Sequence, residues 1–239
     1  MGTRHACADC AIRNSALCRV LSAEQLARLN RVSCRRHYEP GRLIAASDQP
    51  QDWFGNVVSG VVKLTKTLSD GRQQIVGLLF PSDFLGRPFK VRSAYAAEAA
   101  THVELCCFSR QHFEQMMHGE PEMQQLLLEQ TLEEVDAARE WMFVLGRKSA
   151  GEKVATLIRL IVERMRLAPC EACGEPQPLH FDLPLSRTEM ADYLGLRIET
   201  VSRQLKRLRT AGVIEATAGR AITVRDVGAL ERMVETDGG

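Results

Sequence analysis

The sequence predicts an α+β fold in which a small β-roll precedes a long helix and a C-terminal winged helix-turn-helix. Short β-type runs separated by turn residues fill residues 35–110, and a helical pattern then continues from Pro121 to Gly146. Two short helical segments and a hairpin pattern follow at residues 186–224. We therefore divide the chain into an N-terminal lead (1–20), a β-roll domain (21–119), a long helix (120–147) and a C-terminal domain (148–239).

Length and composition are typical of a globular protein with two small domains: 239 residues, 45% hydrophobic and 26% charged. The formal net charge of +1 neither favours nor excludes nucleic acid, so any basic surface must be local. No stretch approaches the roughly eighteen apolar residues of a membrane span, and the N-terminus lacks the apolar core of a secretory signal. We expect a cytoplasmic, reducing location, where clustered cysteines indicate metal or redox chemistry more often than disulfides.

The N-terminal lead holds three of the chain's eight cysteines. Cys7, Cys10 and Cys18 stand at C-x2-C-x7-C spacing in the segment CADCAIRNSALC. Three thiolates this close in sequence can bind one metal centre, and a fourth ligand must then come from elsewhere in the chain. A metal bound here would therefore connect the lead to the body of the protein. Ser22 is the expected N-cap of the helix that follows.

A regular alternation of short strands and glycine-bearing turns indicates the β-roll. The strand-like runs are RLIAA, GVVKLTKTL, QQIVGLLF and HVELCCFS. The turns between them fall at Pro40-Gly41, Ser59-Gly60 and Asp70-Gly71. Evenly spaced short strands of this kind predict a small sandwich or roll.

The long helix carries an apolar seam with heptad spacing. Pro121 suits its first turn. The seam consists of Leu128, Val135 and Met142, interleaved with Thr131, Ala138 and Leu145. About three heptads are enough to predict a helix that pairs with its copy in a homodimer. From the pattern alone, packing of this seam on the protein's own β-roll fits equally well.

The C-terminal segment has the layout of a winged helix-turn-helix. Ser186 and Glu189 form a capping box at the start of one helix, Gly195 suits a tight turn, and residues 197–210 supply a second helix. The segment VIEATAGRAITV then predicts two short strands that form a wing. This order of elements is typical of modules that place their second helix in a DNA major groove.

The second of these helices separates into two faces. Its apolar stripe, expected to be buried, is Ile198, Val201, Leu205 and Leu208. Its polar stripe, expected to enter a major groove, is Glu199, Ser202, Arg203 and Lys206. Residues 186–220 contain seven Lys or Arg against four Asp or Glu, which gives a local basic excess. The pattern predicts double-stranded DNA as a partner; the alternative is an amphipathic helix with a solvated charged face.

Over nearly its whole length the chain resembles the Crp/Fnr superfamily of bacterial transcription regulators. The elements occur in that family's order, and the segment DYLGLRIETVSR is similar to the recognition helix of the Fnr branch. The resemblance implies a cyclic-nucleotide-binding-like β-roll and a homodimer built on the long helix. It also implies a palindromic site with TTGAT-type half-sites read by Glu199, Ser202 and Arg203. An activator of this kind must also contact RNA polymerase, and the sequence shows no nucleophile–base constellation that would indicate an enzyme.

The resemblance also implies a fourth cysteine ligand from the last strand of the β-roll. The strand-to-helix passage CCFSRQHF assigns that ligand to Cys106. Cys107 faces the opposite side of the strand and is expected to be buried. The expected cofactor is thus a [4Fe-4S] cluster on Cys7, Cys10, Cys18 and Cys106, which senses oxygen and permits DNA binding under anoxia.

Two alternatives to the cluster remain open on the sequence. The β-roll could bind a cyclic nucleotide or another small effector, although Arg87 follows Gly86 where a ribose-binding Glu would be expected. Alternatively, the cysteines could be redox-active or bind zinc. A zinc site formed by the lead pair and the second C-x2-C pair, Cys170 and Cys173, would bridge two domains. That site would leave two of the predicted cluster ligands without a role.

Overall fold

The computed structural model describes residue 7 and residues 10–166, 179–216 and 220–235. It divides into two compact units, Met1–Val135 and Asp136–Gly239. The boundary lies inside the long helix, upstream of the boundary at 147/148 that the sequence analysis placed. None of the described helices is both long and apolar enough to cross a membrane.

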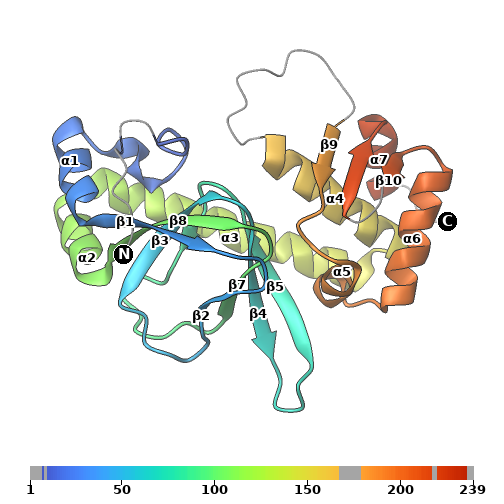
Figure 1. Ribbon diagram of the computed structural model, residues 1–239, viewed down its shortest axis with the longest axis horizontal. Helices are drawn as coiled ribbons and strands as arrows, with labels where there is room; N and C mark the ends of the chain where they lie inside the picture. Colours follow the sequence, from blue (N-terminus) through green and yellow to red (C-terminus); the bar gives the residue numbers. More distant parts are fainter. Residues whose placement is uncertain (1–6, 8–9, 167–178, 217–219, 236–239) are drawn as a thin grey trace. The chain divides into compact units, whose positions relative to one another are not determined.

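The first unit is built on a β-roll of two four-stranded antiparallel sheets (Figure 1). One sheet has the order β1 (Ser33–Tyr38), β8 (Val103–Ser109), β3 (Trp53–Ser59), β6 (Phe84–Leu85); the other has β2 (Leu43–Ala45), β7 (Ala96–Ala99), β4 (Val62–Thr67), β5 (Gln73–Leu79). The predicted turns are confirmed, because Gly41, Gly60 and Gly71 all have positive φ. At Gly60 a Cβ would lie 2.0 Å from the carbonyl oxygen of His102, so only glycine fits there.

Short helices pack the N-terminal lead onto the first sheet. A 3-10 turn (Leu17–Val20) and α1 (Ala23–Val32) precede the roll, and α2 (Arg110–Gly119) follows β8 directly. Ser22 caps α1 as predicted, in a reciprocal capping box with Gln25. One apolar core joins the lead to the roll and to the start of the long helix; it contains Leu17, Leu21, Leu26, Leu29, Phe54, Phe108, Phe113, Met117, Met123 and Leu126.

The long helix α3 runs over Pro121–Arg147. Its buried residues are Met123, Leu126 and Val144, whereas the predicted seam is exposed. The exposed fractions are 60% for Leu128, 38% for Val135, 72% for Met142 and 37% for Leu145, and Ala138 is exposed as well. The described part of the chain therefore leaves this seam uncovered, as a pairing surface requires.

The second unit contains the winged helix-turn-helix. Its elements are α4 (Ala150–Arg166), β9 (Leu179–Asp182), α5 (Arg187–Leu194), α6 (Ile198–Thr210), β10 (Ile214–Ala216), β11 (Ala221–Val224) and α7 (Val227–Glu235). The Ser186–Glu189 capping box and the left-handed Gly195 (φ 61°) are confirmed. The wing has the predicted β10–β11 hairpin, and β9 adds a third antiparallel strand that the sequence analysis did not predict.

The predicted apolar stripe of α6 is partly wrong. Val201 and Leu208 are buried, but Ile198 is 41% exposed because it is the first residue of the helix. Gln204 is buried instead, and its amide oxygen accepts a hydrogen bond from Arg207 (3.3 Å). A buried amide is tolerated when it is hydrogen-bonded, so a residue classed as polar takes a place on the buried face.

Candidate functional site

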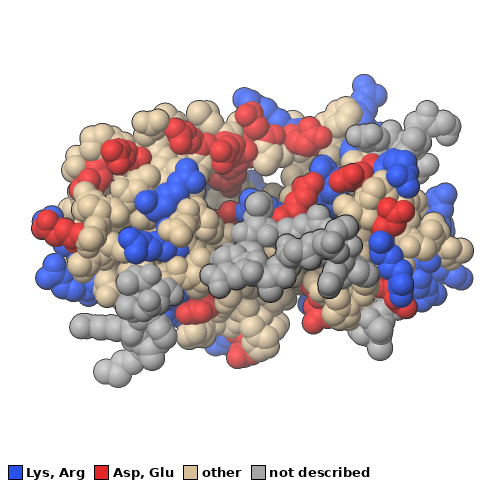
Figure 2. Space-filling model, turned by 90° about the horizontal axis from the view of Figure 1, so that it is seen from above, with Lys and Arg blue, Asp and Glu red and all other residues tan. Residues whose placement is uncertain are grey.

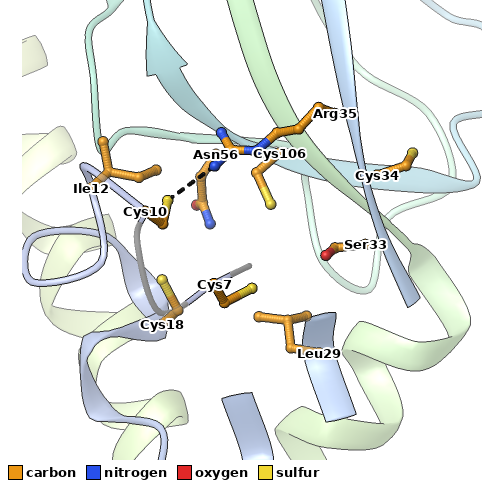
Figure 3. Close-up of a pocket in the computed structure, with 10 residues that line it drawn as sticks. All are labelled: Cys7, Cys10, Ile12, Cys18, Leu29, Ser33, Cys34, Arg35, Asn56 and Cys106. Atoms are coloured by element: carbon orange, nitrogen blue, oxygen red, sulfur yellow. Dashed lines mark hydrogen bonds between the residues drawn. The ribbon is translucent and has the colours of Figure 1, made fainter. Parts of the chain in front are cut away.

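A small pocket between the N-terminal lead and the β1-β8-β3-β6 sheet brings four cysteines together. Cys7, Cys10 and Cys18 come from the lead and Cys106 from β8, and Figure 3 shows their side chains turned toward a common space. The cavity has a volume of about 20 Å³, and its other lining residues are Ile12, Leu29, Ser33, Cys34, Arg35 and Asn56. All four predicted ligands therefore reach one site, although Cys106 lies 88 positions after Cys18 in the sequence.

The strand register decides which of the two adjacent cysteines faces this pocket. Cys106 pairs with Arg35 on β1 and with Asn56 on β3, so these three residues form a row on one face of the sheet. Cys107 points to the other face, where it is 1% exposed within the β-roll core and lies opposite Cys34. The strand register therefore makes Cys106, and not Cys107, the residue of this pair that lines the pocket.

Burial controls the protonation of the pocket thiols. Desolvation raises the pKa of Cys18 to about 11 and that of Cys106 to about 12. It also raises the pKa of Cys7, and the neighbouring Cys10 adds to this increase. Cys7 donates a hydrogen bond to the Asn30 side chain (3.5 Å). At neutral pH these thiols are protonated, so a metal centre that binds them must displace protons.

One cation, which the sequence analysis missed, lies among the thiols. Arg35 Nη2 donates a hydrogen bond to Cys10 Sγ (3.2 Å; Figure 3). Arg35 Nη1 lies 3.4 Å from Glu104 Oε1. Arg35 lowers the pKa of Cys106, although burial outweighs this effect. Recognising it from sequence would have required the β1 strand and its register to be predicted.

The donor set suits an iron–sulfur cluster better than a single ion. Within the described residues, no three His, Cys, Asp or Glu side chains are arranged to hold one metal ion. A polynuclear cluster holds its thiolates farther apart than one ion does, and four cysteines are its usual ligands. Ile12 and Leu29 supply the apolar shielding. The cavity itself admits about one water.

The zinc-site alternative cannot be placed in full. Cys170 and Cys173 lie outside the described residues. The lead pair that this alternative requires faces Cys18 and Cys106 in the pocket. Both residues that the zinc site leaves without a role are therefore neighbours of that pair.

The second candidate site is the polar face of α6. Glu199, Arg203 and Lys206 are exposed and Ser202 is half-buried, as a face that enters a DNA groove requires. Arg207 and Arg209, near the end of the helix, are exposed and suit phosphate contacts. Figure 2 shows Lys and Arg side chains gathered on the part of the second unit where α6 lies. The local basic excess is thus displayed on the surface beside the helix.

Comparison with protein families matches both parts of the chain. Residues 152–233 match the Crp-like helix-turn-helix domain. Residues 35–120 match the cyclic nucleotide-binding domain. The two matches cover the winged helix-turn-helix and the β-roll.

Individual relatives align over nearly the whole chain. The transcriptional activator protein FnrL of Cereibacter sphaeroides is 47% identical over 98% of this chain and 95% of its own length. The nitrogen fixation regulation protein FixK of Bradyrhizobium diazoefficiens is 39% identical over 90% of this chain and 88% of its own. The solved structure of FixK2 from Bradyrhizobium japonicum is 33% identical, covers 84% of this chain and 97% of its own, and superposes with a TM-score of 0.73.

Proposed function

Because the chain belongs to the Crp/Fnr family of transcription regulators, we propose that it is a homodimeric activator that senses oxygen through a [4Fe-4S] cluster. The relatives are transcription regulators, which confirms the expectation that the chain is not an enzyme. The observation that carries the proposal is the pocket in which Cys7, Cys10, Cys18 and Cys106 meet. The name of the relative FnrL, a transcriptional activator protein, agrees with an activating role.

The four cysteines would hold the cluster, which supplies an oxygen-reactive centre when bound. The lead that carries three of them is anchored by Leu17 and Leu21 in the core that also contains Met123 and Leu126 of α3. A change in the position of the lead is therefore transmitted by packed side chains to the start of the pairing helix. Oxygen, by removing the cluster, would withdraw a ligand that favours one arrangement of this core.

The output of the proposed switch is the affinity for DNA. A dimer formed through the exposed α3 seam presents two α6 helices to a palindrome. Glu199, Ser202 and Arg203 would read TTGAT-type half-sites, with Arg203 donating to guanine and Glu199 accepting from a cytosine amine. Lys206, on the same face of α6, would also contact the DNA. Activation would also need a contact with RNA polymerase.

The test is to purify the protein without oxygen and measure iron, sulfide and the visible spectrum. DNA binding to a TTGAT-type palindrome is then measured before and after exposure to air. We expect about four iron and about four sulfide per protomer, as in one [4Fe-4S] cluster, and a large loss of DNA affinity in air. The Cys106→Ser variant serves as the cluster-free control. A colourless protein whose DNA affinity ignores oxygen would contradict the proposal.

A regulator gated by a small effector is the second candidate, because residues 35–120 match a cyclic nucleotide-binding domain. Arg92 and Ser93 superficially resemble the phosphate-binding Arg-Ser pair of the cyclic-nucleotide-binding members of the family, but both side chains are hydrogen-bonded to backbone carbonyls. Arg92 donates to the Asp48 carbonyl (2.7 Å), and the Ser93 hydroxyl donates to the Tyr95 carbonyl (2.8 Å). This candidate predicts that cyclic nucleotides raise DNA affinity and that Cys18→Ala has little effect. The cluster proposal predicts no response of DNA affinity to cyclic nucleotides and a large loss of DNA affinity in Cys18→Ala.

A further inference from the structure

We propose that Arg35 is a positioning residue for the cluster, which hydrogen-bonds a ligand sulfur and offsets the negative charge of the thiolates. This inference rests on the proposed function and adds a determinant of cluster lifetime to it. The lifetime of the cluster in oxygen would then depend on a residue that is not itself a ligand.

The position of Arg35 is fixed from two directions. Its Cα is the cross-strand partner of Cys106, so both side chains leave the same face of the sheet. Its guanidinium lies 3.4 Å from Glu104 and donates to Cys10 Sγ at 3.2 Å. The side chain is only 10% exposed. A buried arginine held by a carboxylate in this way presents its donors in a nearly constant geometry.

Arg35 is the only charged residue among the described residues that line the pocket. Four thiolates carry more negative charge than the cluster core neutralises, so a ligated cluster is an anion. A nearby cation in a low-dielectric site stabilises such an anion strongly. Hydrogen bonds to ligand sulfur and positive charge both make a cluster harder to oxidise. Arg35 should therefore slow the loss of the cluster in oxygen and favour its assembly.

A second polar group on the same row supports a ligand in this space. Asn56 flanks Cys106 on the other side, is 4% exposed, and its Oδ1 makes no hydrogen bond to any described residue. Arg35 Nη1 likewise makes no hydrogen bond within the described residues, apart from its ionic contact with Glu104. Buried polar groups are normally hydrogen-bonded, so two such groups beside Cys106 point to a polar occupant. Rotation of the Asn56 amide would present its –NH₂ as a further donor.

The experiment compares three variants with the wild-type protein. Arg35→Gln removes the charge, and Arg35→Lys retains it without the planar fork. Arg36→Gln is the matched control, because the neighbouring guanidinium lies over the Trp53 ring, 4.8 Å from its centroid, and does not line the pocket. Each protein is reconstituted anaerobically, its iron and sulfide are measured, and the decay of its visible absorption is followed in air.

We expect the Arg35→Gln cluster to decay about tenfold faster than the wild-type cluster, the scale typical of residues that support metal ligands. Arg35→Lys should recover part of this lifetime, and Arg36→Gln should match the wild type. Because Arg35→Gln leaves Glu104 without its cation, thermal unfolding of the metal-free proteins is measured as well. The double variant Arg35→Gln/Glu104→Gln removes the unpaired carboxylate, and its cluster should still decay rapidly.

The outcomes separate this inference from the proposed function. If the wild-type protein binds a cluster and Arg35→Gln decays at the wild-type rate, the role of Arg35 is refuted while the proposed function stands. A double variant that regains the wild-type lifetime would show that Arg35 acts only through folding, which also refutes it. If the wild-type protein takes up no iron and sulfide, both the proposed function and this inference are wrong.

Discussion

Exchanging sulfur for oxygen at two adjacent positions of β8 should separate cluster binding from stability. Cys106 lines the pocket and Cys107 lies 1% exposed in the β-roll core. Cys106→Ser removes a ligand, and its hydroxyl faces the polar groups of Arg35 and Asn56. We therefore expect it to abolish cluster uptake while the melting temperature of the metal-free protein changes little.

Cys107→Ser should have the opposite effect. It places a hydroxyl in an apolar core among residues such as Val57 and Leu105, where an unpaired polar group costs about 1–3 kcal/mol. For a unit of this size that cost corresponds to a fall in melting temperature of roughly 3–10 °C. The cluster should still form, because the pocket keeps its four thiols.

Iron and sulfide analysis after anaerobic reconstitution, together with thermal unfolding of the metal-free variants, measures both effects. The reasoning would be refuted if Cys107→Ser lost the cluster while Cys106→Ser retained it. It would also be refuted if the two variants lost equal amounts of iron and of stability. In the latter case the strand register would not distinguish the two thiols.

Four further predictions concern pH, DNA, assembly and folding. Cys18 (pKa about 11) and Cys106 (pKa about 12) are protonated near neutral pH, so each must lose a proton when it binds the cluster. The affinity for the cluster should therefore rise by about tenfold per pH unit for each thiol between about pH 6.5 and 8.5. Chelator competition measures this affinity, and a flat profile would contradict the prediction. Arg203→Ala should lose about 1–3 kcal/mol of discrimination at one base pair of the half-site, as measured by fluorescence anisotropy. If Arg203→Ala instead weakened binding to all DNA sequences equally, Arg203 would contact phosphate only. Met142→Glu, at the most exposed seam position, should yield a monomer in sedimentation, and an unchanged dimer would exclude the seam. Ser186→Ala should destabilise the second unit by about 1 kcal/mol in chemical denaturation, since the Glu189 N–H loses the Ser186 hydroxyl as its acceptor; no change would mean that another acceptor replaces it.

Features set by local sequence were predicted correctly. The caps at Ser22 and Ser186 and the turn at Gly60 depend on one or two residues and their near neighbours. The same holds for the exposed polar face of α6, because helical spacing alone fixes which side chains share a face. Ile198 was assigned to the buried face incorrectly and Gln204 was not assigned to it, because burial depends on which neighbouring elements cover each position.

The three lead cysteines, the polar face of α6 and the heptad seam could all be predicted before the fold was known, since each is a spacing within one segment. The tertiary structure decided what occupies the space opposite the lead. Strand pairing set Cys106 beside Arg35 and Asn56 and turned Cys107 into the core, because a one-residue difference along a strand reverses the face. The cation beside the thiols is therefore a product of register between distant strands.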